Sequence, residues 1–167
     1  MKNIALRFLL FFGFVALLLS CTSNKFVVDE NNQSGKNATL DFSNQIQVKY
    51  WDGINISERL YKGKKAESLE KSTLIVPSGN KAAIVDAHFM VQVKRYGPKF
   101  EKWFVYNDVK LEYNFEAGKK YQLKTRNREI TNLTIVRQLY FEFYIDLYEG
   151  NRRLKEWKVG DEAISSF

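Results

Sequence analysis

The sequence predicts an all-β fold, an antiparallel β-sandwich of about eight or nine strands. Aromatic residues make up 15% of the 167 residues, and aromatic residues favour strands with large core side chains. Apolar and polar residues alternate with period two over several runs, and turn signals separate these runs without the spacing of βαβ units. A small calycin-like β-barrel is the alternative, because the longest runs suit the strands of a barrel too.

The first twenty residues have the composition of a secretory signal peptide. Lys2 and Arg7 supply positive charge, and residues 8–19 are apolar apart from the neutral Gly13. A helix that spans a bilayer needs roughly 20 apolar residues, so this run is too short to span one. It matches the apolar region of a cleaved signal instead, and we assign residues 1–20 to a signal peptide.

The apolar run ends in Leu18-Leu19-Ser20-Cys21, and this segment resembles the lipobox of bacterial lipoproteins. In that family the cysteine thiol receives a diacylglyceryl group, a peptidase cuts before the cysteine, and the new amino group is acylated. The resemblance implies lipidation of Cys21, with chains such as palmitate, and a place in the bacterial cell envelope on the outer membrane. Two or more acyl chains anchor a protein durably, whereas one binds only marginally.

Two alternatives to a lipoprotein remain open: a cleaved signal with a coincidental cysteine, and a short uncleaved anchor. Cys21 is the only cysteine of the chain and stands where lipidation requires it, which favours the lipoprotein. Residues 22–37 are polar apart from Phe26-Val27-Val28, so we predict that residues 21–37 are the lipidated cysteine and a flexible tether. Residues 38–167 then form a single β-domain.

The turn residues divide this domain into strands. Asp52-Gly53 is a tight hairpin signal, Pro77-Ser78-Gly79-Asn80 is a turn, and Ala117-Gly118-Lys119-Lys120 is another. The predicted strands are residues 38–42, 45–51, 54–60, a run ending at 74–76, 82–94, 100–106, 109–115, 121–125, 133–148 and 152–159. Helix is an option only for residues 67–72 and for the tail after Gly160.

The alternation also predicts which side chains face the core. In residues 82–94 the inward side chains are Val85, Ala87, Phe89, Val91 and Val93, and the outward ones are Asp86, His88, Met90, Gln92 and Lys94. In residues 109–115 the inward ones are Val109, Leu111, Tyr113 and Phe115. Such clean alternation is typical of antiparallel sheets with one wet face.

The turn segments carry a second resemblance. Val76-Pro77-Ser78-Gly79 before a long strand, and the later segment Gly118-Lys119-Lys120-Tyr121, are similar to a pattern in small exported bacterial lipoproteins of largely uncharacterised function. There a Pro-x-Gly turn introduces a strand, and a Gly-Lys-x-Tyr turn closes a hairpin of an immunoglobulin-like β-domain. The resemblance implies fold and location only.

The sequence is poor in residues for catalysis. Its single histidine, His88, lies two positions from Asp86, which would suit a metal pair or a base with its orienting acid. No third ligand is identifiable, so we interpret His88 as a solvent-facing residue beside an unrelated acid. Glu112/Glu116 and Glu142/Asp146 would stand about 13 Å apart along their strands, beyond the separations of about 5–9.5 Å that glycosidases use. We therefore expect no enzyme, no cofactor and no metal.

Basic residues cluster at residues 62–65, 126–128 and 152–153, and the formal net charge is +7. We interpret these clusters as charged loops that keep the domain soluble, with attraction to anionic headgroups or envelope polymers as the sharper alternative. Export argues against nucleic acid as a partner. The expected partners are the membrane, through the lipid anchor, and an envelope polymer or protein.

Residues 139–148 are the most informative strand. One face is apolar, and the other alternates aromatic and acidic side chains: Tyr140, Glu142, Tyr144, Asp146 and Tyr148. On a wet face they would form a platform for an extended cationic or hydroxyl-rich partner. The alternative is that they pack against a neighbouring strand, with arginines of the C-terminal segment pairing the acids.

The sequence thus predicts a non-enzymatic, lipid-anchored envelope protein whose β-domain binds or scaffolds a partner. A barrel that carries an apolar small molecule is the alternative function, and a hydrolase is the third.

Overall fold

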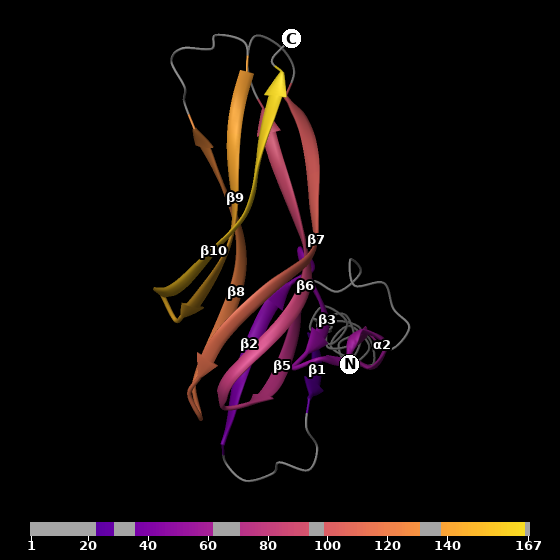
Figure 1. Ribbon diagram of the computed structural model, residues 1–167, viewed down its shortest axis with the longest axis vertical. Helices are drawn as coiled ribbons and strands as arrows, with labels where there is room; N and C mark the ends of the chain where they lie inside the picture. Colours follow the sequence, from indigo (N-terminus) through magenta and orange to yellow (C-terminus); the bar gives the residue numbers. More distant parts are fainter. Residues whose placement is uncertain (1–22, 29–35, 62–70, 94–98, 131–137, 166–167) are drawn as a thin grey trace, which may run out of the picture.

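Two β-sheets pack face to face in the computed structural model, which describes residues 23–28, 36–61, 71–93, 99–130 and 138–165 (Figure 1). Six-stranded sheet A contains, in spatial order, β1 (Ser23–Val27), β5 (Lys71–Pro77), β2 (Asn37–Ser43), β8 (Lys120–Ile130), β9 (Gln138–Glu149) and β10 (Arg152–Ser165). Four-stranded sheet B contains β4 (Ile54–Asn55), β3 (Ile46–Trp51), β6 (Gly79–Val93) and β7 (Phe100–Phe115). The predicted all-β sandwich is confirmed.

The sheets are not purely antiparallel. β1 pairs with β5 in parallel, and so does β2 with β8, whereas the other neighbours are antiparallel. The second parallel pair joins strands that are far apart in the chain. After β2 the chain passes through β3 and β4 of sheet B, β5 of sheet A, and β6 and β7 of sheet B before β8 enters sheet A beside β2. Local alternation contains no information about such long-range pairing.

The long strands β6 to β10 extend beyond the short ones and divide the molecule into two halves (Figure 1). β3 pairs with β6 only as far as Ala87, and β2 pairs with β8 only as far as Leu123. Above those points the molecule consists of β8, β9 and β10 of sheet A facing β6 and β7 of sheet B.

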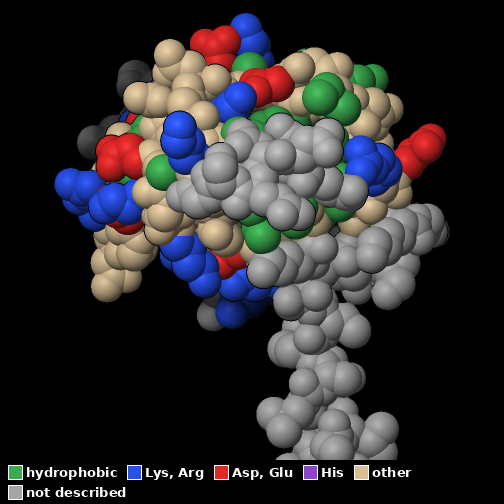
Figure 2. Space-filling view, turned by 90° about the horizontal axis from the view of Figure 1, so that it is seen from below, with side chains coloured by type: hydrophobic (Ala, Val, Ile, Leu, Met, Phe, Trp, Pro, Cys, Tyr) green, Lys and Arg blue, Asp and Glu red, His purple; other side chains and the backbone are tan. Residues whose placement is uncertain are grey.

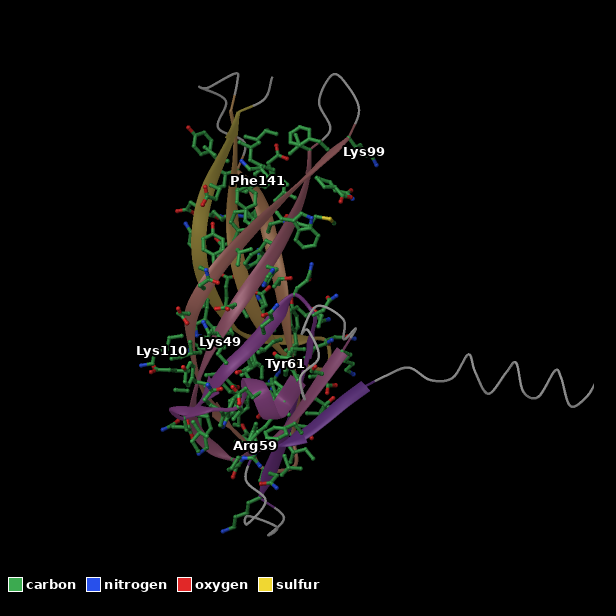
Figure 3. The ribbon with its side chains drawn as sticks, turned by 90° about the vertical axis from the view of Figure 1, so that its right-hand side faces the viewer. Lys49, Arg59, Tyr61, Lys99, Lys110 and Phe141 are labelled. Carbon is green, nitrogen blue, oxygen red and sulfur yellow. The ribbon has the colours of Figure 1, made fainter. Side chains whose placement is uncertain are left out.

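The side chains of β6 and β9 that the alternation predicted to face the core are buried. The predicted inward residues of β6 are all buried, and Asp86, His88 and Met90 are only half-buried. In β9 the apolar face is buried along its whole length, and Phe143 packs on Phe89, Phe104 and Tyr106 with ring centroids 5.0–5.5 Å apart. Figure 3 shows Phe141 pointing into the upper half, whereas Lys99 and Lys110 point away from the body.

The predicted Asp52-Gly53 hairpin is confirmed, but the strand after it is short. Asp52 and Gly53 have φ angles of 47° and 79°, and β3 pairs with β4 across them. The prediction of a strand over residues 54–60 is wrong, because α2 (Ser57–Tyr61) follows β4. Asn55 accepts hydrogen bonds from the backbone N–H and the hydroxyl of Ser57, and starts the helix as a cap does.

The turns at residues 77–80 and 117–120 connect the two sheets. β5 and β8 belong to sheet A, whereas β6 and β7 belong to sheet B, so neither turn closes a hairpin. The hairpin implied for Gly118–Tyr121 by the resemblance is therefore wrong, although a strand does begin at Gly79, where φ is 105°. The predicted break at Asn107-Asp108 is a β-bulge inside the continuous strand β7, with φ of 57° at Asp108.

Both ends of the domain differ from the prediction. Residues 23–27, predicted as part of a flexible tether, form β1, and Phe26 is buried against the core. The tail after Gly160, for which helix was an option, continues β10 and pairs with β9 as far as Ser165.

Residues 62–65 and 67–70, and the signal segment, lie outside the described residues. Within the described part, no helix has the length and apolar content needed to cross a membrane.

Candidate functional site

The aromatic and acidic face of β9 lies on the outer face of sheet A, between β8 and β10. Arg126 and Arg128 of β8 stand opposite Tyr144 and Glu142, and Lys158 of β10 stands opposite Tyr144 on the other side. The five predicted residues lie together on one face, as the alternation requires. The alternate residues of β9, from Leu139 to Leu147 in steps of two, are buried in the core on the opposite face.

Asp146 is fully buried at the centre of this face and is held by arginine. Arg126 donates from Nε to Oδ2 at 2.7 Å and from Nη2 to Oδ1 at 3.4 Å. Arg153 of β10 lies 3.7 Å from Oδ2, and the hydroxyl of Tyr148 donates to the same oxygen at 3.5 Å. This bidentate arginine contact satisfies a carboxylate that has no access to water.

Glu142 is bound from three sides. Lys158 donates to Oε1 at 2.8 Å, the hydroxyl of Tyr144 donates to Oε2 at 2.6 Å, and Nε of Arg128 donates to Oε2 at 3.0 Å. The hydrogen bond from Lys158, followed by those from Tyr144 and Arg128, lowers the pKa of Glu142 from 4.5 to about 2. The hydrogen bond that the Tyr144 hydroxyl donates to Glu142 also raises the pKa of Tyr144 above its ordinary value.

The prediction that this face is wet is wrong. Glu142, Tyr144 and Asp146 are buried, and Tyr140 and Tyr148 are half-buried. The guanidinium of Arg126 lies 4.3 Å from the centre of the Tyr144 ring, and Lys124 Nζ lies 4.9 Å from that of Tyr148. Cations from β8 cover the Tyr144 and Tyr148 rings, so these two rings do not form an exposed platform.

The basic residues at 126–128 and 152–153 that the structure describes pair with acids of the protein itself. Arg126 and Arg128 lie inside strand β8 and not in a loop, because β8 continues to Ile130. Arg152 pairs with Glu149, and Arg153 pairs with Glu156 at 2.8 Å. The sequence alternative in which C-terminal arginines pair the acids is therefore confirmed for Arg153, whereas the partners from β8 were missed. The period-two spacing of residues 124, 126 and 128 was the signal that could have found them.

A third buried carboxylate on the same face was not predicted. Asp41 of β2 accepts a hydrogen bond from Thr73 at 2.7 Å and pairs with Lys71 at 2.9 Å and Lys120 at 3.3 Å. Burial raises the pKa of Asp41, but the hydrogen bonds from Lys71, Thr73 and Lys120 outweigh it and leave the pKa below its ordinary value. Only the tertiary arrangement of β2, β5 and β8 brings these residues together.

The other candidates for chemistry stand apart. Asp86 pairs with Lys49 at 3.3 Å and accepts from the backbone N–H of Asp108, so it does not orient His88. Ser78 lies in the turn between the sheets, where its N–H donates to the carbonyl of Lys36. In the described part of the chain, no three His, Cys, Asp or Glu side chains are placed to hold a metal ion. Cys21 lies outside the described residues.

The hollows of the surface are open and polar. A groove of about 600 Å³ lies at the lower end of sheet B beside Lys155, and one of about 500 Å³ lies at the lower end of sheet A beside Asp41. Figure 2 shows this end, with basic side chains around the rim and acidic ones among them. The apolar cavity between Trp51, Leu111 and Leu147 measures only about 10 Å³, so the core there is filled.

Apolar side chains are exposed on the opposite face. Trp103 and Val105 of β7 are 55% and 49% exposed on the outer face of sheet B, beside Met90 and His88 of β6. In the described residues, no lysine or arginine lies over the Trp103 ring. The outer face of sheet B also carries ion pairs, among them those of Lys49 with Asp86 and Asp108.

Comparison of the chain with protein-family models, with curated proteins and with solved structures found no match.

Proposed function

We propose that this protein is a non-enzymatic, lipid-anchored component of the bacterial cell envelope, whose β-sandwich binds or scaffolds an envelope partner. The observation that carries the proposal is Cys21, the only cysteine of the chain, directly after Leu18-Leu19-Ser20 at the end of an apolar run. The mature chain begins at Cys21, and its anchor is the acylated cysteine.

The fold supports a binding or scaffolding role more than a carrier role. A pocket for a small ligand measures about 300–1,000 Å³ and is mostly apolar. Among the described residues, the apolar cavity beside Trp51 in the core is far smaller, at about 10 Å³, and the two grooves at the lower end are open and lined mostly by charged and polar residues. A partner would therefore meet the outside of the sandwich.

Replacing Cys21 tests the anchor. Cys21→Ala removes the thiol that forms the thioether, so the variant should stay unacylated and uncut at this site. Ser20→Ala is the matched control, because it keeps a small residue before the cysteine and should be processed normally. The measurement is the mass of each protein from fractionated cells. A Cys21→Ala protein processed like the wild type would contradict the proposal.

A further inference from the structure

The first described strand begins almost at the proposed anchor. Ser23 starts β1, and Cys21 lies two positions before it. An extended chain advances at most about 3.6 Å per residue, so the two Cα atoms are no more than about 7 Å apart.

β1 is fastened to sheet A. It pairs in parallel with β5 from Ser23 opposite Lys71 to Val27 opposite Ile75, and Val28 donates its N–H to the carbonyl of Ile75 at 3.0 Å. Phe26 is buried under the guanidinium of Arg59, 5.3 Å from the ring centre. Figure 3 shows Arg59 on α2 close to β1. The anchor thus leads directly into the edge of sheet A.

The outer face of sheet A carries cations in its outermost layer. They are Lys71, Lys120, Lys124, Arg126, Arg128, Arg153 and Lys158. Three carboxylates lie beneath them, with side chains only 5%, 12% and 1% exposed at Asp41, Glu142 and Asp146. The two more exposed acids, Glu156 and Asp161, are each paired with a cation of the same face.

We propose that the outer face of sheet A lies against anionic lipid headgroups, held there by the acylated Cys21 at its edge. This inference rests on the proposed lipid anchor and names the surface that meets the membrane. The short connection keeps the face at the bilayer, where its effective concentration is high. Each lysine or arginine near an anionic surface favours the docked state about fivefold, and salt screens the attraction.

The same orientation leaves sheet B free. Its outer face, with the exposed Trp103 and Val105, points away from the membrane and is accessible to an envelope partner.

Site-specific labels test the orientation in the full chain. Gln122→Cys places a thiol on the outer face of sheet A, and Asn114→Cys places one on the outer face of sheet B. Since Cys21 is the only natural cysteine and its sulfur is acylated, each introduced thiol can be labelled alone. The labelled proteins are reconstituted in vesicles of phosphatidylcholine and phosphatidylglycerol in equal amounts, with nitroxide at the lipid headgroups.

With a fluorescent label on each thiol, quenching of its fluorescence by the nitroxide should be several times stronger at position 122 than at position 114. High salt should weaken the quenching at position 122. Equal quenching at the two positions, or stronger quenching at 114, would overturn the proposal. Vesicles of phosphatidylcholine alone should lose most of the difference, because they lack the anionic charge.

A charge reversal supplies the second arm. Lys124 lies over the Tyr148 ring and has no ion pair in the described part of the chain, so Lys124→Glu breaks no ion pair there. Lys102→Glu is the matched control, because Lys102 of β7 lies over the Phe104 ring in the same way, 5.1 Å from its centre. Because Lys124→Glu changes the charge by two units, it should lower the ratio of docked to undocked protein about 25-fold, and Lys102→Glu should leave it unchanged.

The two proposals fail in different ways. Peptide mass spectrometry of the same preparation reports whether Cys21 carries its acyl chains. An unmodified Cys21 overturns the lipid anchor and the docking inference with it. An acylated Cys21 with equal quenching at positions 122 and 114 overturns the docking inference alone.

Discussion

Asp146 is a fully buried carboxylate on the outer face of sheet A. The carboxylate lies between two arginines, Arg126 and Arg153, and Arg126 donates two hydrogen bonds to it, at 2.7 and 3.4 Å. A buried ion pair adds little net stability while intact, but removal of one partner leaves an uncompensated charge.

Arg126→Ala should therefore lower the free energy of unfolding by about 3 kcal/mol, as expected for the loss of one partner of a buried pair. Arg152→Ala is the matched control, because Arg152 is 73% exposed and pairs with the partly exposed Glu149. It should change stability by no more than about 0.5 kcal/mol. Urea denaturation of the two variants measures both values, and equal losses would show that Arg126 does not stabilise a buried charge.

Glu142 makes stability depend on pH in the acid range. Its pKa in the folded protein, about 2, lies below the ordinary value of 4.5, so the folded state favours the ionised form. Its contribution is fully present above about pH 4.5 and is lost as the pH falls toward 2. Asp41, whose pKa is also lowered, acts in the same direction.

The urea concentration at the denaturation midpoint should thus decrease as the pH is lowered from 5 to 2. The decrease should be smaller in Glu142→Gln. Part of the dependence should remain in that variant because Asp41 still titrates. If the midpoint of the variant depended on pH as steeply as that of the wild type, the contacts of Glu142 with Lys158, Tyr144 and Arg128 would not stabilise its ionised form.

At the scale of elements, the contact between β10 and β7 joins the two sheets in the upper half. The Tyr106 ring lies against Gly160, and a Cβ placed on Gly160 would stand 2.6 Å from Cζ of Tyr106. The hydroxyl of Tyr106 also lies 3.4 Å from a carboxylate oxygen of Glu162. Burial, and then the charge of Glu162, raise the pKa of Tyr106 to about 12. Glycine is needed here for close approach and not for an unusual φ.

Gly160→Ala should cost about 1–3 kcal/mol, as overpacking does. In a Tyr106→Leu background the same change should cost much less, because the ring that the methyl group meets is gone. The double-mutant cycle gives the coupling between the two positions. Additive effects would contradict the close packing of β10 on β7.

The elements that could be predicted are those whose signals are local. The buried parity of β6 and β9 and the Asp52-Gly53 hairpin follow from side-chain period and turn chemistry. The parallel partners of β2 and β5 could not be predicted, since pairing depends on contacts between distant segments. β1 was missed because Phe26-Val27-Val28 is too short a run to stand out from polar neighbours.

For the candidate site, the sequence predicted which residues share a face of β9 but not which side chains cover that face. The alternation placed Tyr140, Glu142, Tyr144, Asp146 and Tyr148 on one face correctly, and parity alone indicated a wet face. Whether water or another side chain covers a face depends on the register of its neighbours. Here that register sets Arg126 and Arg128 of β8 beside the acids.

At the scale of the whole molecule, the sandwich has a charged outer face on sheet A and exposed apolar side chains on sheet B. The edge strand β1 of sheet A begins at Ser23, two positions after Cys21, the proposed anchor. The account therefore depends first on the chemistry of one sulfur atom, that of Cys21.

The intact mass of the wild-type protein extracted from membranes tests this claim most directly. We expect the mass of a chain that begins at Cys21, increased by a diacylglyceryl group and an amide-linked acyl chain. A mass that corresponds to the uncut chain, to cleavage at another residue, or to an unmodified Cys21 would contradict the account.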